Sequence, residues 1–519
     1  MVSRRMSESR NEFTGLVEET EESHNDTTTL LSGSVTSSSG KYTVGRRRSL
    51  EEEGGLGGDD NDGEYTFDEA VEHMGFGKFH WKLLILCGVG YFAEITELVI
   101  VGFVAPAIEK DMGLSSVEYG LLGSSSFIGM AAGAIFWGYI SDRFGRLVSF
   151  SLTVWMTFIG GFLSAFSPNY PILFILRFLA AFGIGGMLPV DYTIFLEFLP
   201  TLKRGSHIVL VDAVGVIPAL FVSAIVAYCF SGNDDIRWRW VLGIVSIPVG
   251  VMAVLRRHVP ESPRYYLAIN EVDKAQKILE EVAAANGVSL PPGRLAPLRR
   301  PAGDAADGGG GGSHGNISLL FKGDTLKATT PRLWLLWFLT QFSSAGMVFA
   351  LPKIFDETFS VSKKRIALDL LWGVFGLVPG LAIAYFVVER SRKYSLAGYY
   401  VAAGASVFMF MLATVGFLRN EFLAVLMSVA LRGAMEGCFA ILNCTSVEAY
   451  PTPVRASGLG NAQIFDHIAG AISPLFFSIF NDNTKLRPIA MTLYAVAYLL
   501  AFLPAVTLPK DYVGQAIKD

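Results

Sequence analysis

The sequence is poor in charged residues. Only 17% of its 519 residues are Asp, Glu, Lys or Arg, whereas 51% are hydrophobic and the mean hydropathy is +0.42. In soluble domains about a quarter of all residues are charged, so this composition argues against a soluble enzyme. The net charge of −5 is small and no basic face accompanies a soluble domain, which argues against a nucleic-acid partner.

Cysteine and the signatures of common catalytic sites are also scarce. Four cysteines lie in or at the ends of apolar runs, and we expect small buried hydrophobic side chains rather than disulfides or metal ligands: Cys87, Cys229, Cys438 and Cys444. No P-loop, zinc signature or serine hydrolase signature is found. We therefore expect no enzyme activity, no cofactor and no metal. The polar N-terminus does not resemble a cleavable signal peptide.

Long apolar runs dominate the rest of the chain. A helix needs about 20 apolar residues to cross a bilayer. Six such runs precede a polar central segment: 83–107, 117–140, 147–167, 171–195, 206–230 and 238–258. Six follow it: 332–352, 366–388, 395–417, 422–446, 456–480 and 486–508. The sequence therefore predicts an all-α membrane protein with twelve transmembrane helices.

The polar segments complete the expected organisation. Residues 1–63 are predicted to be a disordered cytoplasmic tail. Residues 64–258 and 332–508 form the two halves, with a cytoplasmic central loop at 259–331 and a cytoplasmic C-terminus at 509–519. Within the loop, 270–286 is predicted to be helical and 301–315 to be a flexible linker. The tail holds an acidic dileucine pattern for a sorting adaptor (Asp26, Leu30, Leu31) and a basic kinase-site pattern at 46–49.

Two further features concern the membrane. Residues 67–81 mix acids with aromatics, and form either an amphipathic helix along the membrane surface or a plain loop. Lys and Arg gather in one set of loops, which places both termini and the central loop in the cytoplasm. These basic loop residues include Arg143, Arg146, Lys203, Arg204, Arg390, Arg392, Lys393 and Arg455.

One pattern occurs twice. Each copy begins with an arginine in an apolar, Gly-rich run, at Arg177 and at Arg432, and ends in a polar turn. In each turn Pro-Thr lies between a glutamate and an arginine seven residues later: Glu197 with Arg204, and Glu448 with Arg455. The copies are 251 residues apart at the turn and 255 at the first arginine. The spacing predicts two homologous halves, each a six-helix bundle; the alternative is coincidence between two Gly-rich helices.

A charged motif follows the second apolar run. It comprises Gly138, Asp142, Arg143, Gly145 and Arg146, in which the glycines permit close helix approach and a tight turn. Such a cluster can latch one conformation and release it in another; the alternative is an ordinary basic loop. We expect the same cytoplasmic gate to include Asp191, Glu197, Arg204, Glu261, Arg264, Glu448 and Arg455. Asp191 and Asp212 could equally serve helix packing.

Five motifs carry a family resemblance. They are GYISDRFGR (138–146), LRFLAAFGIGG (176–186), EFLPTLKRG (197–205), PESPR (260–264) and EAYPTPVRASG (448–458). With the segment 75–97, they resemble the major facilitator superfamily, in its sugar-porter and synaptic-vesicle-2-related (SVOP-like) branch, which includes transporters of organic acids. The resemblance implies the major facilitator fold of two pseudo-symmetric bundles.

Three positions depart from the family pattern. Leu147 replaces a basic residue, and the second-half loop at 389–393 lacks the glycine of the first-half motif. The glutamine-rich pattern of the seventh helix is reduced to Gln341 with Ser343 and Ser344. This last departure argues against a hexose substrate.

Ionisable groups inside the membrane suggest function. Glu94 and Glu97 share one face of the first helix, about 18 Å from its cytoplasmic start, and Arg177 lies at about the same depth. In transporters that the family resembles, an acid in the first helix takes a proton under the control of an arginine in the fourth. A guanidinium favours the ionised form of a carboxyl group, whereas burial favours the neutral form. The alternative is a static buried ion pair.

The second half has its own polar groups near the midplane: Gln341, Arg432, Glu436, Asp466 and His467. They either bind substrate or form structural pairs. We therefore expect a secondary active transporter of a small polar or charged organic solute, working by alternating access and coupled to protons. The alternatives are a facilitative uniporter and a protein of this fold that senses or binds without transport. The expected location is an endomembrane, a vesicle or vacuole, or the plasma membrane.

Overall fold

The computed structural model describes residues 63–200, 203–229, 237–257, 259–297, 317–359, 363–415, 419–481 and 486–513. These residues belong to one compact unit, Asp62–Asp519. The sorting and kinase patterns of the tail and the expected linker at 301–315 lie outside the described residues.

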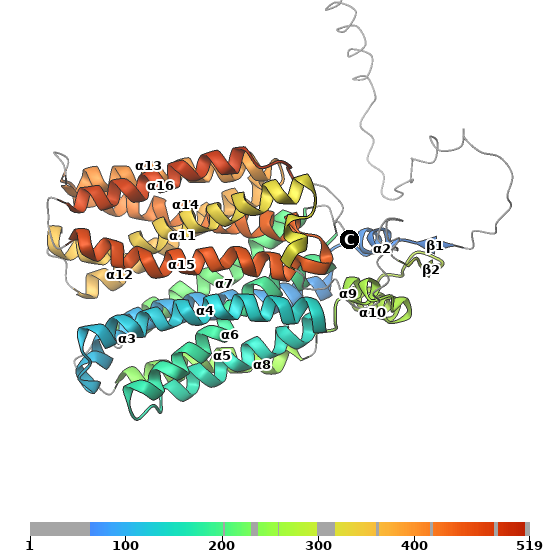
Figure 1. Cartoon of the computed structure of the whole chain (residues 1–519), viewed down its shortest axis with the longest axis horizontal. Coiled ribbons are helices and arrows are strands. Elements are labelled where there is room, and N and C mark those ends of the chain that lie inside the picture. The colour runs from blue at the N-terminus through green and yellow to red at the C-terminus, as the bar shows by residue number, and fades with distance from the viewer. Residues whose placement is uncertain are drawn as a thin grey trace, which may run out of the picture. The chain divides into compact units, whose positions relative to one another are not determined.

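Twelve long helices make up most of the described chain (Figure 1). The first six are α3 (Lys78–Met112), α4 (Ser116–Phe144), α5 (Arg146–Ser164), α6 (Tyr170–Phe198), α7 (Arg204–Cys229) and α8 (Arg237–Arg256). The others are α11 (Gly323–Phe359), α12 (Lys363–Val387), α13 (Arg392–Val415), α14 (Glu421–Ala449), α15 (Arg455–Asn481) and α16 (Arg487–Val506). Each predicted apolar run falls on one of these helices, so the twelve-helix prediction is confirmed.

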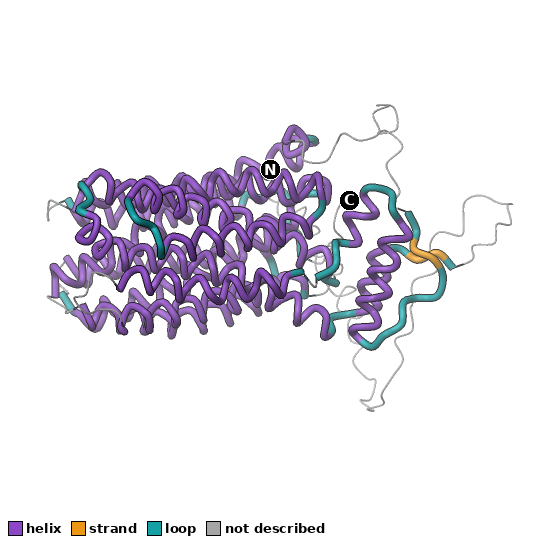
Figure 2. The backbone as a smooth tube through the Cα atoms, turned by 90° about the horizontal axis from the view of Figure 1, so that it is seen from below, coloured by secondary structure: helices purple, strands orange, loops and turns teal. Residues whose placement is uncertain are grey.

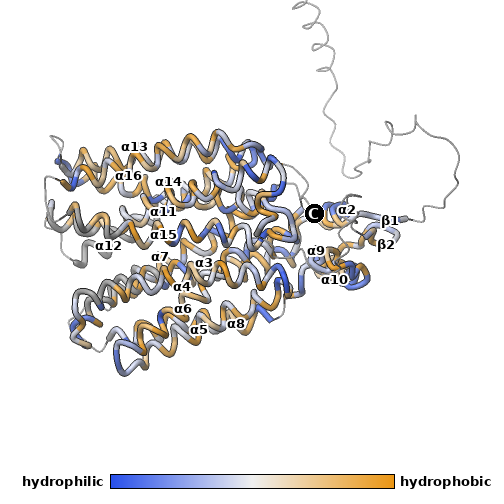
Figure 3. Tube along the Cα trace, viewed as in Figure 1, coloured by the Kyte–Doolittle hydropathy of each residue, from blue (hydrophilic) through white to orange (hydrophobic). Residues whose placement is uncertain are grey.

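Hydrophobic residues, orange in Figure 3, recur along the long helices. Over the described residues, seven of them are long and apolar enough to cross a membrane by length and composition alone: α5, α6, α7, α8, α13, α14 and α16. Cys87, Cys438 and Cys444 are buried in the bundle with free thiols, as the sequence predicted.

The helices form two bundles of six. Within the first bundle α4 and α5 pack against α6, and α3 packs against α7; within the second, α11 packs against α15 and α13 against α14 and α16. In Figure 1 the first bundle is blue to green and lies below the yellow to red second bundle. The most extensive contacts between the bundles are those of α4 with α15 and of α7 with α12. Residues far apart in sequence therefore face each other across this interface.

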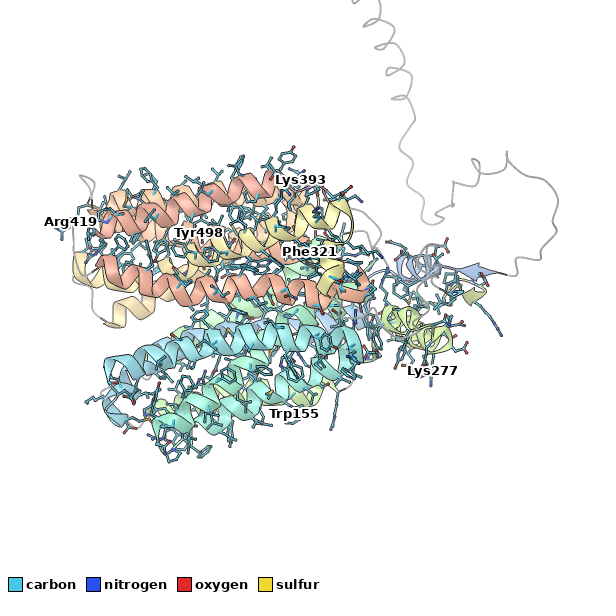
Figure 4. The ribbon with its side chains drawn as sticks, in the orientation of Figure 1. Trp155, Lys277, Phe321, Lys393, Arg419 and Tyr498 are labelled. Carbon is cyan, nitrogen blue, oxygen red and sulfur yellow. The ribbon has the colours of Figure 1, made fainter. Side chains whose placement is uncertain are left out.

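A small module lies at one end of the bundles (Figure 2). It contains β1 (Glu64–Tyr65), α2 (Phe67–Met74), α9 (Pro263–Ala268), α10 (Val272–Asn286) and β2 (Arg294–Leu295). Two short 3-10 helices, η2 (Ile317–Phe321) and η3 (Thr452–Val454), complete the elements. We call this end of the bundles the α10 end; in Figure 4 Lys277 marks the module and Arg419 lies at the opposite, far end.

Two structures were predicted for residues 67–81, an amphipathic helix along the membrane surface or a plain loop, and the module shows which of them forms. Strand β1 pairs in parallel with β2, and the helix α2 begins at a capping box in which Thr66 and Glu69 bond each other's backbone. The apolar face of α2, with Phe67, Ala70 and Met74, is buried in the protein. Residues 67–74 are thus helical and 78–81 begin α3, but the apolar face of α2 is covered by protein. The helix predicted at 270–286 is α10.

Glycines set how closely the helices approach. At Gly185 of α6, an added Cβ atom would lie 2.0 Å from the backbone oxygen of Met130 in α4. No side chain fits in this space, so the Gly-rich run of α6 serves helix packing, as the sequence indicated.

Gly185→Ala should therefore destabilise the protein, because α4 and α6 must separate to accept one methyl group. We expect a loss of about 1–3 kcal/mol, the usual cost of overpacking, seen as a lower melting temperature of the purified protein. The control is Gly398→Ala in α13, where an added Cβ meets nothing within 4 Å and alanine favours the helix. Equal melting temperatures for the two variants would contradict this packing argument.

Candidate functional site

A buried cluster of charges closes the α10 end. Arg146, at the start of α5, pairs with Asp142 at 3.4 Å and with Glu197 of α6 at 3.1 Å. Glu197 also accepts Arg455 of the second bundle at 3.1 Å. All four side chains are almost fully buried. One carboxylate thus joins two guanidinium groups from opposite bundles.

Backbone groups strengthen this connection. Asp142 accepts the amide of Ser457 at 2.7 Å and that of Ala456 at 3.3 Å, so it caps backbone amides that have no partner within the helix at the start of α15. Arg146 donates to the carbonyl oxygen of Thr452 at 2.9 Å. Side chains of the first bundle therefore bond both side chains and backbone groups of the turn between α14 and α15.

The second bundle contains the same arrangement. Arg392, at the start of α13, pairs with Glu448 of α14 at 2.9 Å and with Glu389 at 3.5 Å. Glu389 accepts the amide of Ser206, near the start of α7, at 2.6 Å. Ser206 and Ser457, whose amides are capped in the two copies, are 251 positions apart. The loop at 389–393 lacks the glycine of the first-half motif, yet it builds the equivalent cluster.

A third carboxyl group supports each copy. Glu261 accepts the amides of Arg146 at 2.9 Å and of Leu147 at 3.0 Å. Asp511 accepts the amide of Arg392 at 3.0 Å in the other copy. Burial raises the pKa of the Glu261 carboxyl, although these backbone amides favour its ionised form. Leu147, which replaces a basic residue of the family pattern, thus contributes through its backbone.

The glycines of the first-half motif have distinct tasks. Gly145 has φ +105°, in the region that favours glycine, and joins α4 to α5. Gly138 lies where α4 meets α15, and an added Cβ atom would be 2.9 Å from the carbonyl oxygen of Ala456.

Several predicted gate residues lie elsewhere. Arg143 is exposed and donates to Tyr139, outside the buried cluster. Arg264 of α9 pairs with Asp68 of α2, so this ion pair lies within the module. Arg204 is buried and donates to the carbonyl oxygen of Leu199 at 3.2 Å.

Asp191 is a packing residue of the first bundle. It forms a buried ion pair with Arg256 of α8. The same guanidinium donates to the carbonyl oxygens of Leu86 in α3 at 3.1 Å and Phe150 in α5 at 3.0 Å. Four helices of one bundle are therefore tied at this point, and of the two readings left open for Asp191 the geometry favours helix packing.

A second polar layer lies deeper in the bundle; the sequence analysis named its Asp212 as a gate or packing residue but missed Tyr192 and Asn443. Asn443 of α14 donates to the Tyr192 hydroxyl at 3.3 Å and to Asp212 at 3.2 Å. Tyr192 itself donates to Asp212. This triad again joins the bundles. The internal repeat could have revealed these two residues, because Tyr192 and Asn443 occupy equivalent positions 251 residues apart.

Glu94 and Glu97, the acidic residues of α3 near the membrane centre, lie in different environments. Arg177 forms a buried ion pair with Glu97, so the arginine and one of the two acids meet as expected. Glu94 is 8% exposed, and its Oε2 has no hydrogen-bond partner among the described residues. The two glutamates, one turn apart, are therefore not equivalent.

The second bundle faces these acids. Glu436 accepts the Tyr91 hydroxyl of α3 at 3.2 Å, across the bundle interface. Arg432 lies one turn from Glu436 on α14. Asp466 and His467 contact each other at 3.3 Å.

Gln341 is half-buried on α11, near the point where α15 approaches at Gly470. Its neighbours Ser343 and Ser344 bond within the second bundle, to the Tyr494 carbonyl oxygen at 3.0 Å and to the Tyr498 hydroxyl at 2.6 Å.

Two six-helix bundles joined across a polar interface form the major facilitator fold. A solved structure has the same fold: the proton:xylose symporter XylE bound to 6-bromo-6-deoxy-D-glucose, with a TM-score of 0.70 at 17% identity over 85% of this chain and 98% of that chain.

The chain belongs to the family described as "Sugar (and other) transporter", which it matches over residues 65–510. It is 30% identical to the synaptic vesicle 2-related protein of Rattus norvegicus over 88% of this chain and 83% of that protein. It is 29% identical to organic cation/carnitine transporter 7 of Arabidopsis thaliana, over 89% and 97% respectively. It is also 29% identical to the niacin transporter NiaP of Acinetobacter baylyi, over 78% and 88%. The protein is a multi-pass membrane transporter of the sugar-porter, SVOP-like type, and the family consists of transporters rather than enzymes.

Removing the shared carboxylate should open the α10 end. Glu197→Gln leaves Arg146 and Arg455 buried without their common partner, which should cost about 3–5 kcal/mol and lower the melting temperature. A Ser457→Cys thiol, almost fully buried in the parent, should then react several-fold faster with a maleimide. The control is Glu281→Gln, an exposed acid of α10. Unchanged thiol reactivity in Glu197→Gln would show that this cluster does not hold the bundles together.

Proposed function

We propose that the protein is a proton-coupled secondary active transporter of a small, charged or polar organic solute. The observation that carries this proposal is the buried Glu97–Arg177 pair beside Glu94, whose Oε2 has no partner among the described residues. One arginine cannot neutralise two neighbouring acids. A proton on one of the acids supplies what the arginine does not, because an unpaired charge inside a membrane protein is costly.

The charge clusters at the α10 end suit alternating access. They join the bundles by bonds that must break as a set before that end opens, which favours two discrete states over gradual movement. The excess of Lys and Arg in the loops at this end supports a cytoplasmic orientation. Under this proposal residues 64–258 and 332–508 are the two moving bodies, and 259–331 is the cytoplasmic connection between them.

The names of relatives support a charged solute without giving the sign of its charge. One relative is named for organic cations and carnitine and another for niacin. The solved symporter of the same fold is named for protons together with xylose, which supports proton coupling here.

A facilitative uniporter and a non-transporting binding protein are the alternatives. The complete second-half cluster around Arg392 favours transport, because a protein that never changes state has no need of two matched sets of breakable bonds. The uniporter would require Glu94 and Glu97 to be structural or substrate-binding groups only.

The proton proposal is tested by accumulation against an imposed pH gradient in proteoliposomes. The probes are radiolabelled choline, nicotinate and xylose, and the variants are Glu94→Gln and Glu97→Gln. At least one of these variants should lose accumulation driven by the gradient, while Glu281→Gln retains it. If both variants concentrate a probe with unchanged pH dependence, protons do not bind at these acids.

Exchange experiments distinguish a proton site from a substrate-binding site at Glu94 and Glu97. A variant that lacks only the proton site should still exchange labelled for unlabelled probe across the membrane without a gradient. Loss of exchange in both variants, with normal folding, would instead assign the two acids to substrate binding.

The location is proposed to be a vesicle, vacuole or other endomembrane, with the plasma membrane as the alternative. The name of the rat relative and the dileucine pattern at Leu30 and Leu31 support an endomembrane. A Leu30→Ala, Leu31→Ala variant should move to the cell surface when expressed with a fluorescent tag. Identical distribution of the variant and the parent would remove the case for a sorting adaptor at Asp26, Leu30 and Leu31.

A further inference from the structure

Asp212 of α7 is a buried carboxyl group that joins the bundles without a basic partner. Its side chain is 0% exposed. Its Oδ1 accepts the Tyr192 hydroxyl of its own bundle and, at 3.2 Å, the side-chain amide of Asn443 in the other. None of the ion pairs found among the described residues includes Asp212. This acid therefore differs from the gate carboxylates, which bond to arginines or cap helix starts.

No arginine lies at the level of Asp212 on the three helices that form the triad. At 1.5 Å per residue, the arginine of each helix is about 12, 22 or 16 Å along the axis from the triad residue of that helix: Arg204 of α7, Arg177 of α6 and Arg432 of α14. Arg256, whose partner Asp191 precedes Tyr192, is engaged by that acid and by two carbonyl oxygens of the first bundle. An ionised Asp212 would thus lack a counter-charge there, which is costly inside a membrane protein.

The other titratable groups around Asp212 are mainly acids and phenols. The helices α3, α6, α12 and α14 pack against α7. Apart from free thiols, these helices carry the following groups within about two turns of the contact: Tyr91 and Glu94 of α3, Asp191 and Glu197 of α6, Glu436 of α14 and Tyr385 of α12. The two basic groups in this range lie toward the α10 end: Lys82 is exposed, and His207 stacks on Phe76 at 4.0 Å and bonds the carbonyl oxygen of Lys203.

Two acceptor atoms of the triad have no donor. Asp212 Oδ2 and Asn443 Oδ1 lack a hydrogen-bond partner among the described residues, although both side chains are at most 1% exposed. Buried polar atoms are normally bonded. A neutral carboxylic acid and a primary amide are complementary: the amide N–H donates to one acid oxygen, and the acid O–H donates to the amide oxygen. The first of these bonds is present, and a proton on Asp212 Oδ2 supplies the donor for the second.

We propose that Asp212 binds a proton when the α10 end is closed, and that the neutral acid donates from Oδ2 to Asn443 Oδ1. The two side chains then join the bundles by two hydrogen bonds. Separation of the bundles admits water to Asp212, which favours the ionised form, so the proton leaves as this end opens. Proton binding and closure therefore support each other. Asp212 is a second proton-binding residue, distinct from Glu94 and Glu97 of the proposed function, and only its role in coupling rests on that function.

The first test measures closure of the α10 end against pH. The reporter is the Ser457→Cys thiol, whose labelling by a maleimide is followed by mass spectrometry of the labelled peptide. Its rate is divided by that of Glu281→Cys, an exposed position of α10, which corrects for the pH dependence of thiol reactivity. Rising pH removes the proton from Asp212, so this ratio should increase about threefold or more between about pH 6 and about pH 9. A ratio that does not change with pH overturns the proposal.

Two substitutions assign the pH dependence to the acid–amide pair. Asp212→Asn keeps an N–H donor in place of the acid O–H, so its ratio should stay at the low-pH value of the parent throughout. Asn443→Ala removes the partner, so its ratio should stay high throughout. Unchanged pH dependence in Asp212→Asn would show that another group titrates, and would overturn the proposal.

Infrared spectroscopy detects the proton without relying on labelling. At neutral pH the parent should show the C=O stretch of a neutral carboxylic acid that is absent from Asp212→Asn. The matched control is Glu94→Gln, which should retain this band. If the difference between the parent and Asp212→Asn is instead the band of an ionised carboxylate, Asp212 is charged in the closed state and the proposal fails.

These outcomes are separable from those of the proposed function. Glu94→Gln and Glu97→Gln should keep the pH-dependent closure even where they lose accumulation. If closure loses its pH dependence in them and keeps it in Asp212→Asn, the proton at the α3 acids controls closure, and the Asp212 proposal alone is overturned. If Asp212 controls closure but the parent accumulates no probe under a pH gradient, proton binding at Asp212 stands and proton-coupled transport is overturned.

Discussion

At the closed α10 end one carboxylate, Glu197, is shared between Arg146 of its own bundle and Arg455 of the other. Inside a membrane protein, water cannot replace a lost partner, so each of these charges requires the others. The same constraint explains why Asp142 lies at the start of α15, where backbone amides lack partners within the helix. The bundle interface is stable at this end because no member of the cluster can leave alone.

The internal repeat gives this arrangement a second copy. Arg392, Glu389 and Glu448 occupy the positions that Arg146, Asp142 and Glu197 occupy in the first half, and Asp511 corresponds to Glu261. The chemistry is preserved although the residues differ: Glu389 replaces an aspartate and the glycine is absent. What the fold requires at these points is a carboxylate near a helix start and a guanidinium beside it, and more than one local sequence supplies them.

Toward the centre of the membrane the bonding of the acids changes. At the α10 end the carboxyl groups of the two clusters bond to arginines or to backbone amides, whereas at the centre Glu94 Oε2 has no hydrogen-bond partner among the described residues. A fully bonded cluster suits a gate, which must be stable by itself in one state. An acid without a partner suits the proposed proton site, whose partner arrives from solution.

The sequence by itself determined the twelve helices, the two-fold repeat and most members of the charged clusters. Apolar runs and repeated motifs are local patterns, and hydrophobicity alone decides which segments cross a bilayer. It did not decide that Arg177 engages Glu97 and leaves Glu94, that Asp191 ties four helices of one bundle, or that Tyr91, Tyr192 and Asn443 join the bundles. Those outcomes depend on helix rotation and on which helices of the two halves meet. Rotation and contact are set by packing between segments more than 200 residues apart, so only the tertiary structure could decide them.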